Sequence, residues 1–135
     1  EEKKIGLDKK KTIENFYKKI SKIKDDTIEL LEKIKLKNKT VIGYGASTKG
    51  NVLLQYYGLN NKQIPLIADR NPYKFGRYTP GTKIKIVSEK VARKLKPDYF
   101  FVLPWHFRKE ILKRENKLIK KGTKFIFPLP KLRLN

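Results

Sequence analysis

Cysteine and methionine are absent from this chain of 135 residues, which also has only one histidine and thirteen acidic residues. Without cysteine there is no disulfide, no thiolate nucleophile and no Cys-ligated zinc. One histidine and few acids leave a poor choice of metal ligands, so we expect no metal site. Because the chain begins at Glu1 rather than at methionine, we also consider it as a piece of a larger protein.

Long apolar runs are missing as well. No stretch approaches the roughly 18 consecutive apolar residues of a membrane span, and none has the residue order of a signal peptide. A hydrophobic content of 39% over this length is enough for one modest core. We therefore expect a cytoplasmic protein with one compact unit, residues 39–135, preceded by a helical connector over residues 1–38.

Positive charge is in large excess, with a formal net charge of +21. Taken alone, that charge predicts attraction to nucleic acid or to an anionic surface. The excess comes from 28 lysines and only 6 arginines, spread through nearly every segment, whereas base readout and bidentate phosphate recognition favour arginine. We interpret most of the charge as a solvated surface without specificity for nucleic acid, and a basic polyanion-binding protein stays open as an alternative.

Apolar residues recur at mostly three- and four-residue steps from Asp8 to Leu36, with lysine and glutamate between them. This spacing predicts one long amphipathic helix whose apolar positions are Ile13, Phe16, Ile20, Ile23, Ile28, Leu31 and Ile34. A pattern of this length ahead of a compact unit is typical of a helix that bridges to another domain or packs along the flank of its own.

Downstream, strand-like and helix-like segments alternate. The strands are expected at 40–45, 64–68, 83–87, 99–103 and 124–127, and the helices at 51–57, 88–95 and 106–121. The segment from Tyr99 to Leu103 is apolar throughout, as are strands covered on both faces. This alternation predicts an α/β fold, a Rossmann-like, mostly parallel sheet with flanking helices.

Ligands in such sheets bind beyond the carboxyl ends of the strands, at the switch in strand order. The first segment expected there, residues 43–51, is a glycine loop between a strand and a helix. Its glycines let the backbone approach a ligand, and N–H groups at the helix start favour phosphate oxygens. The spacing fits neither a dinucleotide fingerprint, which needs glycine at Thr48, nor a P-loop, which needs lysine at Asn51. The alternative interpretation, a tight turn that binds no ligand, is retained for this segment.

Two further segments reach the same edge, residues 69–81 and 104–106. Asp69 stands where a second-strand acid bonds a ribose hydroxyl, or it caps the following turn. The polar residues after it suit phosphate or sugar, or are solvated charge. Trp105 can stack on a base or sugar, and His106 can cap its helix or contact substrate. The candidate substrate-binding residues are Gly43, Tyr44, Gly45, Ala46, Ser47, Lys49, Gly50, Asn51, Asp69, Arg70, Asn71, Lys74, Arg77, Trp105 and His106.

These loops carry a family resemblance. The stretches GYGASTKGNVLLQYYGL, DRNPYKFGRYTPGT and PDYFFVLPWHFRKEI occur in this order, and residues 39–130 resemble the C-terminal domain of the sugar C-methyltransferase family. Members of that family consist of an N-terminal zinc-binding portion, a central S-adenosylmethionine-dependent methyltransferase domain and a Rossmann-like C-terminal domain. A nucleotide-linked keto-sugar lies between the last two and is methylated on the carbon next to its ketone.

The resemblance implies that the glycine loop and the loop from Asp69 to Gly81 hold the nucleotide-sugar, with Trp105 and His106 at the border of the cleft. The family's catalytic base belongs to the central domain, and His106 stands where many members have asparagine, so we assign no catalytic residue here. We expect a substrate-binding domain that is inactive alone and binds no cofactor, with S-adenosylmethionine held by a methyltransferase domain in the same or another chain. The alternative is a stand-alone or fused carbohydrate- or nucleotide-binding module without methyltransferase activity.

Overall fold

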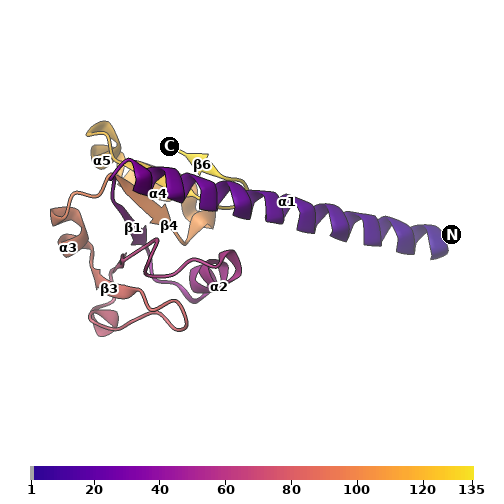
Figure 1. Ribbon diagram of the computed structural model, residues 1–135, viewed down its shortest axis with the longest axis horizontal. Helices are drawn as coiled ribbons and strands as arrows, with labels where there is room; N and C mark the ends of the chain where they lie inside the picture. Colours follow the sequence, from indigo (N-terminus) through magenta and orange to yellow (C-terminus); the bar gives the residue numbers. More distant parts are fainter. Residues whose placement is uncertain (1) are drawn as a thin grey trace.

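A six-stranded sheet forms the centre of the protein in the computed structural model, which describes the backbone of residues 2–135 and the side chains of residues 9–135 (Figure 1). The strand order is β3-β2-β1-β4-β5-β6, and every neighbouring pair is parallel except β5 and β6. The strands are β1 Val41–Tyr44, β2 Leu66–Asp69, β3 Lys85–Ser88, β4 Tyr99–Val102, β5 Lys124–Phe127 and β6 Arg133–Leu134. The predicted α/β fold with a mostly parallel sheet is confirmed.

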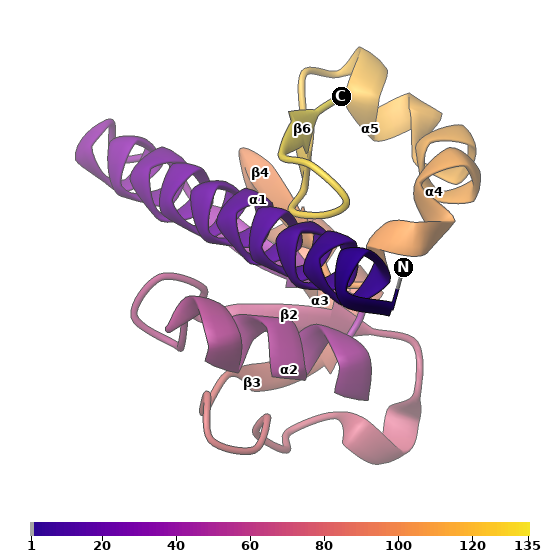
Figure 2. The same ribbon diagram turned by 90° about the vertical axis from the view of Figure 1, so that its right-hand side faces the viewer.

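Helices cover both faces of the sheet. They are α1 Glu2–Leu36, α2 Thr48–Tyr57, α3 Glu89–Lys94, α4 Arg108–Arg114 and α5 Asn116–Lys120, with 3-10 turns η1 Pro72–Lys74 and η2 Trp105–Phe107. The strands alternate between two cores, as a period of two requires. Phe101 and Ile126 face α1 and α2, whereas Phe100 and Phe125 face α3 and α4. Figure 2 shows α1 and α2 side by side on one face of the sheet.

The predicted long helix is confirmed as α1, but only its second half packs on the sheet (Figure 1). Ile23, Leu31 and Ile34 are buried there, and the hydroxyl of buried Thr27 donates to the carbonyl oxygen of Ile23 at 2.6 Å. The apolar face predicted for the first half is exposed. No helix in the described part of the chain is long and apolar enough to cross a membrane.

The single helix predicted over residues 106–121 is wrong. The chain forms η2, α4 and α5 instead, and the break falls at Glu115, whose side chain is only 3% exposed. Its carboxylate turns inward to pair with Arg93, a long-range contact that periodicity does not reveal. The sequence also missed β6, which returns after Pro128 and Pro130 to pair with β5.

The other boundaries agree closely with the predictions. Ser47 caps α2 and Gly58 ends it in the left-handed conformation, although α2 begins three residues before its predicted start at Asn51. Ser88 caps α3, in which Ala92 is buried, whereas Val91 and the C-terminal Leu95 are exposed. The division into residues 1–38 and 39–135 stays a prediction.

Candidate functional site

The strand order changes direction between β1 and β4, because the chain proceeds from β1 to β2 and β3 on one side and then crosses to β4 and β5 on the other. The loops that follow β1 and β4 diverge at such a point, and open α/β sheets bind their ligands there. Gly45–Ser47 and Pro104–Phe107 are the segments at this position. The candidate site therefore lies at this edge, where the loop after β2 joins it.

The glycines of the first loop are required by packing. Gly45 has a φ of +84°, and a Cβ on it would stand 2.8 Å from Cδ of Pro104. A Cβ on Gly43 would stand 2.8 Å from Cγ1 of Ile67, and one on Gly50 would overlap Cβ of Leu103. The loops after β1 and β4 thus touch directly, so a ligand would lie over them and not between them.

Asp69 joins the first loop to the second. Its Oδ2 accepts the N–H of Ala46 at 2.9 Å, and its Oδ1 accepts the N–H of Asn71 at 2.8 Å. Lys74 adds a second connection, since its Nζ donates to the carbonyl oxygen of Ala46 at 2.8 Å and lies 3.7 Å from Oδ2 of Asp69. Both carboxylate oxygens of Asp69 are used in holding the two loops together, as expected if it caps the turn.

Other predicted residues also support the loops. The amide of Asn51 donates to the carbonyl oxygen of Pro80 at 2.9 Å and accepts the hydroxyl of Thr82 at 2.7 Å. Arg70 donates from Nε to Glu89 at 2.9 Å, on the α3 side of the sheet. The side chains of Ser47 and Asn71 accept backbone N–H groups at the starts of α2 and η1. These contacts fix the shape of the edge before any ligand arrives.

Tyr44 lies apart from the other predicted residues. Its side chain is 4% exposed and points into the α3–α4 core, where its hydroxyl contacts Arg114 and, at 3.3 Å, Glu115. Burial raises the pKa of Tyr44. Burial alone would raise the pKa of Glu115 too, but the hydrogen bonds and charge of Arg93 outweigh it and lower that pKa. The carbonyl oxygen of Tyr44 accepts the N–H of Leu103 at 3.0 Å, so neither this oxygen nor the side chain is available to a ligand at the edge.

Besides Arg70 and Asn71, which are exposed but hydrogen-bonded, four of the predicted side chains face outward. Lys49, Arg77 and His106 are exposed, and Trp105 is half-buried. The edge of the Trp105 ring lies against His106, with 5.9 Å between ring centroids. Lys49 and Trp105 also line a cavity of about 380 Å³ between α1 and α2. Lys49 and Trp105 thus lie together at this edge, whereas Arg77 lies alongside β3, where its carbonyl oxygen accepts the N–H of Ile86 at 2.8 Å.

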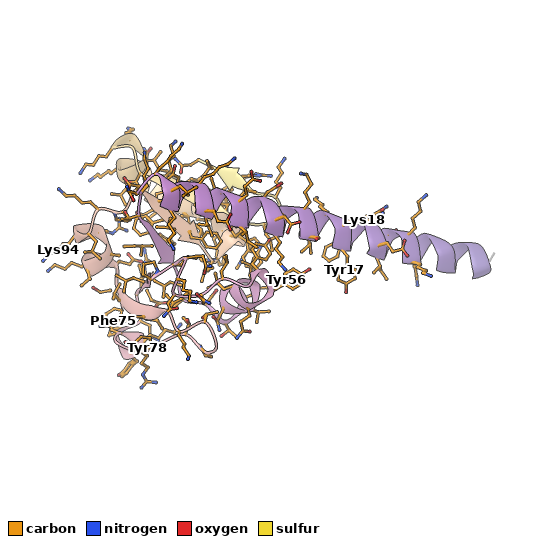
Figure 3. All side chains as sticks on the ribbon, in the orientation of Figure 1. Tyr17, Lys18, Tyr56, Phe75, Tyr78 and Lys94 are labelled. Carbon is orange, nitrogen blue, oxygen red and sulfur yellow. The ribbon has the colours of Figure 1, made fainter. Side chains whose placement is uncertain are left out.

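The sequence analysis missed three aromatic side chains in the second loop. Tyr73, Phe75 and Tyr78 are 85%, 37% and 61% exposed, and Figure 3 shows Phe75 and Tyr78 close together at the end of the molecule near β3. Three aromatic residues in a segment rich in glycine and proline, where a core position is not expected, were the sequence signal that could have found them. Within residues 9–135, no group of three or more His, Asp or Glu side chains could hold a metal ion.

A family model described as "C-methyltransferase C-terminal domain" matches residues 1–130. The chain belongs to this family. The family resemblance inferred from the three loop motifs is thereby confirmed, and the match extends beyond those motifs to include α1. The three loop motifs indicated the resemblance only for residues 39–130.

This C-methyltransferase C-terminal domain has a curated relative in Streptomyces niveus, "C-methyltransferase NovU". The two are 34% identical over 134 residues, which is 99% of this chain and 32% of NovU. The chain therefore spans about a third of the length of the curated relative that it matches.

Proposed function

We propose that this domain binds a nucleotide-linked sugar and holds it for C-methylation, while S-adenosylmethionine binds to a separate methyltransferase domain. The observation that carries the proposal is the connection of the first two loops at the switch point through Ala46, Asp69 and Lys74. An edge fixed in this way is preorganised, which lowers the cost of ordering on binding. The relative's description as a C-methyltransferase supports the reaction class.

The chemistry of the edge suits such a ligand. Lys49 and Arg77 supply positive charge for a diphosphate, and the first turn of α2 adds backbone N–H groups. Trp105 and Tyr73 offer rings on which a base or a sugar face can stack. Holding the sugar beside a bound methyl donor contributes through proximity, which is worth several kcal/mol in a reaction of two substrates.

The domain alone should neither bind S-adenosylmethionine nor methylate a sugar, because its one glycine loop is assigned to the nucleotide-sugar. Calorimetric titration with S-adenosylmethionine tests this directly, and micromolar binding would contradict the assignment. Affinity for the nucleotide-sugar should be modest, because no second domain closes over the ligand to offset the cost of immobilising it.

The test of the site is chemical-shift mapping at physiological salt with UDP-, dTDP- and GDP-linked hexoses. Perturbations should cluster at residues 46–51, 69–78 and 105–106. Lys49→Ala and Arg77→Ala should each weaken binding by about 1–3 kcal/mol if the side chain makes a charge-assisted bond. Lys121→Ala is the matched control, because Lys121 is exposed before β5, at the opposite edge of the sheet.

Two other substitutions test the site less cleanly. Gly45→Val would place a branched side chain against Pro104 at a positive φ, so it is expected to disturb the fold. Arg70→Ala would break the ion pair with Glu89 as well as any ligand contact. If Lys49→Ala and Arg77→Ala bind like the unmodified chain, or if the perturbations cluster on α1, the proposed site is wrong.

A further inference from the structure

The first half of α1 carries an apolar face that extends beyond the sheet. Ile13, Phe16 and Tyr17 are 55%, 58% and 61% exposed, and the rings of Phe16 and Tyr17 meet edge to face at 6.0 Å. Figure 1 shows this part of the helix projecting away from the rest of the molecule. Neighbouring exposed apolar side chains of this size mark an interaction surface more often than isolated ones do.

The spacing of that face is the spacing of a coiled-coil seam. Alternating steps of three and four residues run without interruption through Ile13, Phe16, Ile20, Ile23, Thr27, Leu30 and Ile34. A repeat of 3.5 residues keeps one narrow face of a helix toward a partner that lies along it, and that partner is typically another helix. In the second half of α1 this seam is covered by the domain's own core, where Ile23, Thr27 and Ile34 are buried. The first half presents the same seam uncovered.

Helix α2 extends the surface sideways. Val52 and Tyr56 are 59% and 49% exposed, and they line the cavity of about 380 Å³ together with Tyr17, Ile20 and Trp105. Tyr17 and Tyr56 lie on the same side of α1 in Figure 3. A partner that binds along the uncovered seam would therefore reach the ring of Trp105, at the edge of the candidate site.

The charge of α1 decides which kind of partner fits the uncovered seam. Residues 9–22 of α1 contain six lysines against one acid, Glu14. Of the lysines, Lys9, Lys10 and Lys19 lie on or beside the seam, whereas Lys11, Lys18 and Lys22 lie on the opposite face of the helix. A second copy of this chain would bring the same positive charges against them, and like charges across an interface are repelled. A membrane-surface helix is held by the apolar area that it buries, and over residues 9–22 this area consists of Ile13, Phe16, Tyr17 and Ile20 alone. A helix with acidic residues beside its apolar seam fits both the register and the charge.

We propose that the projecting half of α1 and the exposed face of α2 form a docking surface for an acidic amphipathic helix of the methyltransferase portion. The relative has room for such a partner, since the matched segment is 32% of its length and the other 68% (100 − 32) has no counterpart in this chain. The identity of this partner rests on the proposed function, whereas the seam and its charge do not. Docking there would bring the methyl-donor domain beside Trp105.

The test uses the 135-residue chain and a synthetic three-heptad peptide with leucine at the seam positions and glutamate beside them. Trp105 is the only tryptophan of the chain, so its fluorescence reports on occupation of the cavity. The acidic peptide should bind saturably and shift the emission of Trp105. Phe16→Ser should weaken binding at least about tenfold, as loss of a central aromatic anchor does. Lys18→Ser, on the opposite face of the helix, should leave binding within about twofold of the unmodified chain.

Three results would overturn the proposal. They are equal binding of a peptide with lysine in place of glutamate, peptide binding that Phe16→Ser does not change, and association only with phosphatidylserine vesicles or with a second copy of the chain. Circular dichroism of Phe16→Ser should match that of the unmodified chain, because Phe16 is 58% exposed. A negative result in the nucleotide-sugar titration would refute the proposed function without changing the peptide result, so the two failures are distinguishable.

Discussion

Replacing Glu115 by glutamine should destabilise the domain by about 2–3 kcal/mol. The two oxygens of the Glu115 carboxylate accept hydrogen bonds from the two terminal guanidinium nitrogens of Arg93, at 2.7 and 2.8 Å. A neutral amide of the same shape turns one of those acceptors into a donor and removes the counter-charge. A hydrogen bond to a charged group contributes about 1.5–3 kcal/mol. Breaking a fully buried pair costs about 3–5 kcal/mol. Arg93 is 36% exposed and keeps Glu89 at 3.5 Å, so we expect less than that full penalty.

The pH dependence of stability checks the same reasoning. Because the folded-state pKa of Glu115 is lowered from its ordinary value of 4.5, its stabilising contribution is present above that value. The contribution is lost as the pH falls through the lower folded-state pKa. Urea unfolding should therefore show a large difference between the unmodified chain and Glu115→Gln at pH 7, and the difference should shrink below about pH 4.

Glu29→Gln is the matched control, because Glu29 pairs with Lys33 at 3.2 Å on the surface of α1 with both side chains more than 60% exposed. Exposed pairs of this kind contribute about 0.3–0.5 kcal/mol. If Glu115→Gln costs no more than Glu29→Gln, or if the difference at pH 7 persists unchanged in acid, the carboxylate of Glu115 does not hold α3 and the α4–α5 junction together as described.

Three further outcomes are expected. Gly50→Ala should destabilise the domain by about 1–3 kcal/mol in urea unfolding, because the added Cβ overlaps Leu103, and a variant as stable as the unmodified chain would contradict that contact. Burial raises the pKa of Tyr57 from 10.0 to about 12, so the stabilising contribution of its protonated hydroxyl is present below pH 10 and is lost as the pH rises towards 12. Over that range Tyr57→Phe should lose less stability than the unmodified chain, and equal losses would contradict the burial effect. Oligonucleotide binding, followed by fluorescence anisotropy, should be insensitive to sequence and largely lost at moderate salt, whereas sequence-selective binding at physiological salt would favour a nucleic-acid function.

Much of the fold could be predicted because its signals are local. The apolar strand from Tyr99 to Phe101, the cap at Ser88 and the left-handed glycine at Gly58 are each recognisable from a few neighbouring residues. The break at Glu115 could not be predicted in this way. Its cause is a pairing with Arg93, 22 residues away in sequence, and without it residues 106–121 have the pattern of one helix.

The candidate site divides along the same line. The sequence places three polar, glycine-rich loops after three strands, and parallel pairing brings such loops to one edge. Which side chains stay available at that edge depends on contacts between distant segments. Asp69 accepts the N–H of Ala46, Arg70 pairs with Glu89, and Asn51 accepts the hydroxyl of Thr82. More of the proposed binding is therefore assigned to Lys49, Arg77 and Trp105.

The sequence by itself determined the alternation of strands and helices, the family motifs and the presence of a long helix ending at Leu36, because each depends on residues close together along the chain. Only the tertiary structure decided where α1 stops packing. Its seam repeats evenly from Ile13 to Ile34, and nothing in the pattern distinguishes the half that covers the sheet from the half that projects. The sheet is shorter than the helix, so its area sets how much of the apolar face is buried and leaves the rest available to a partner.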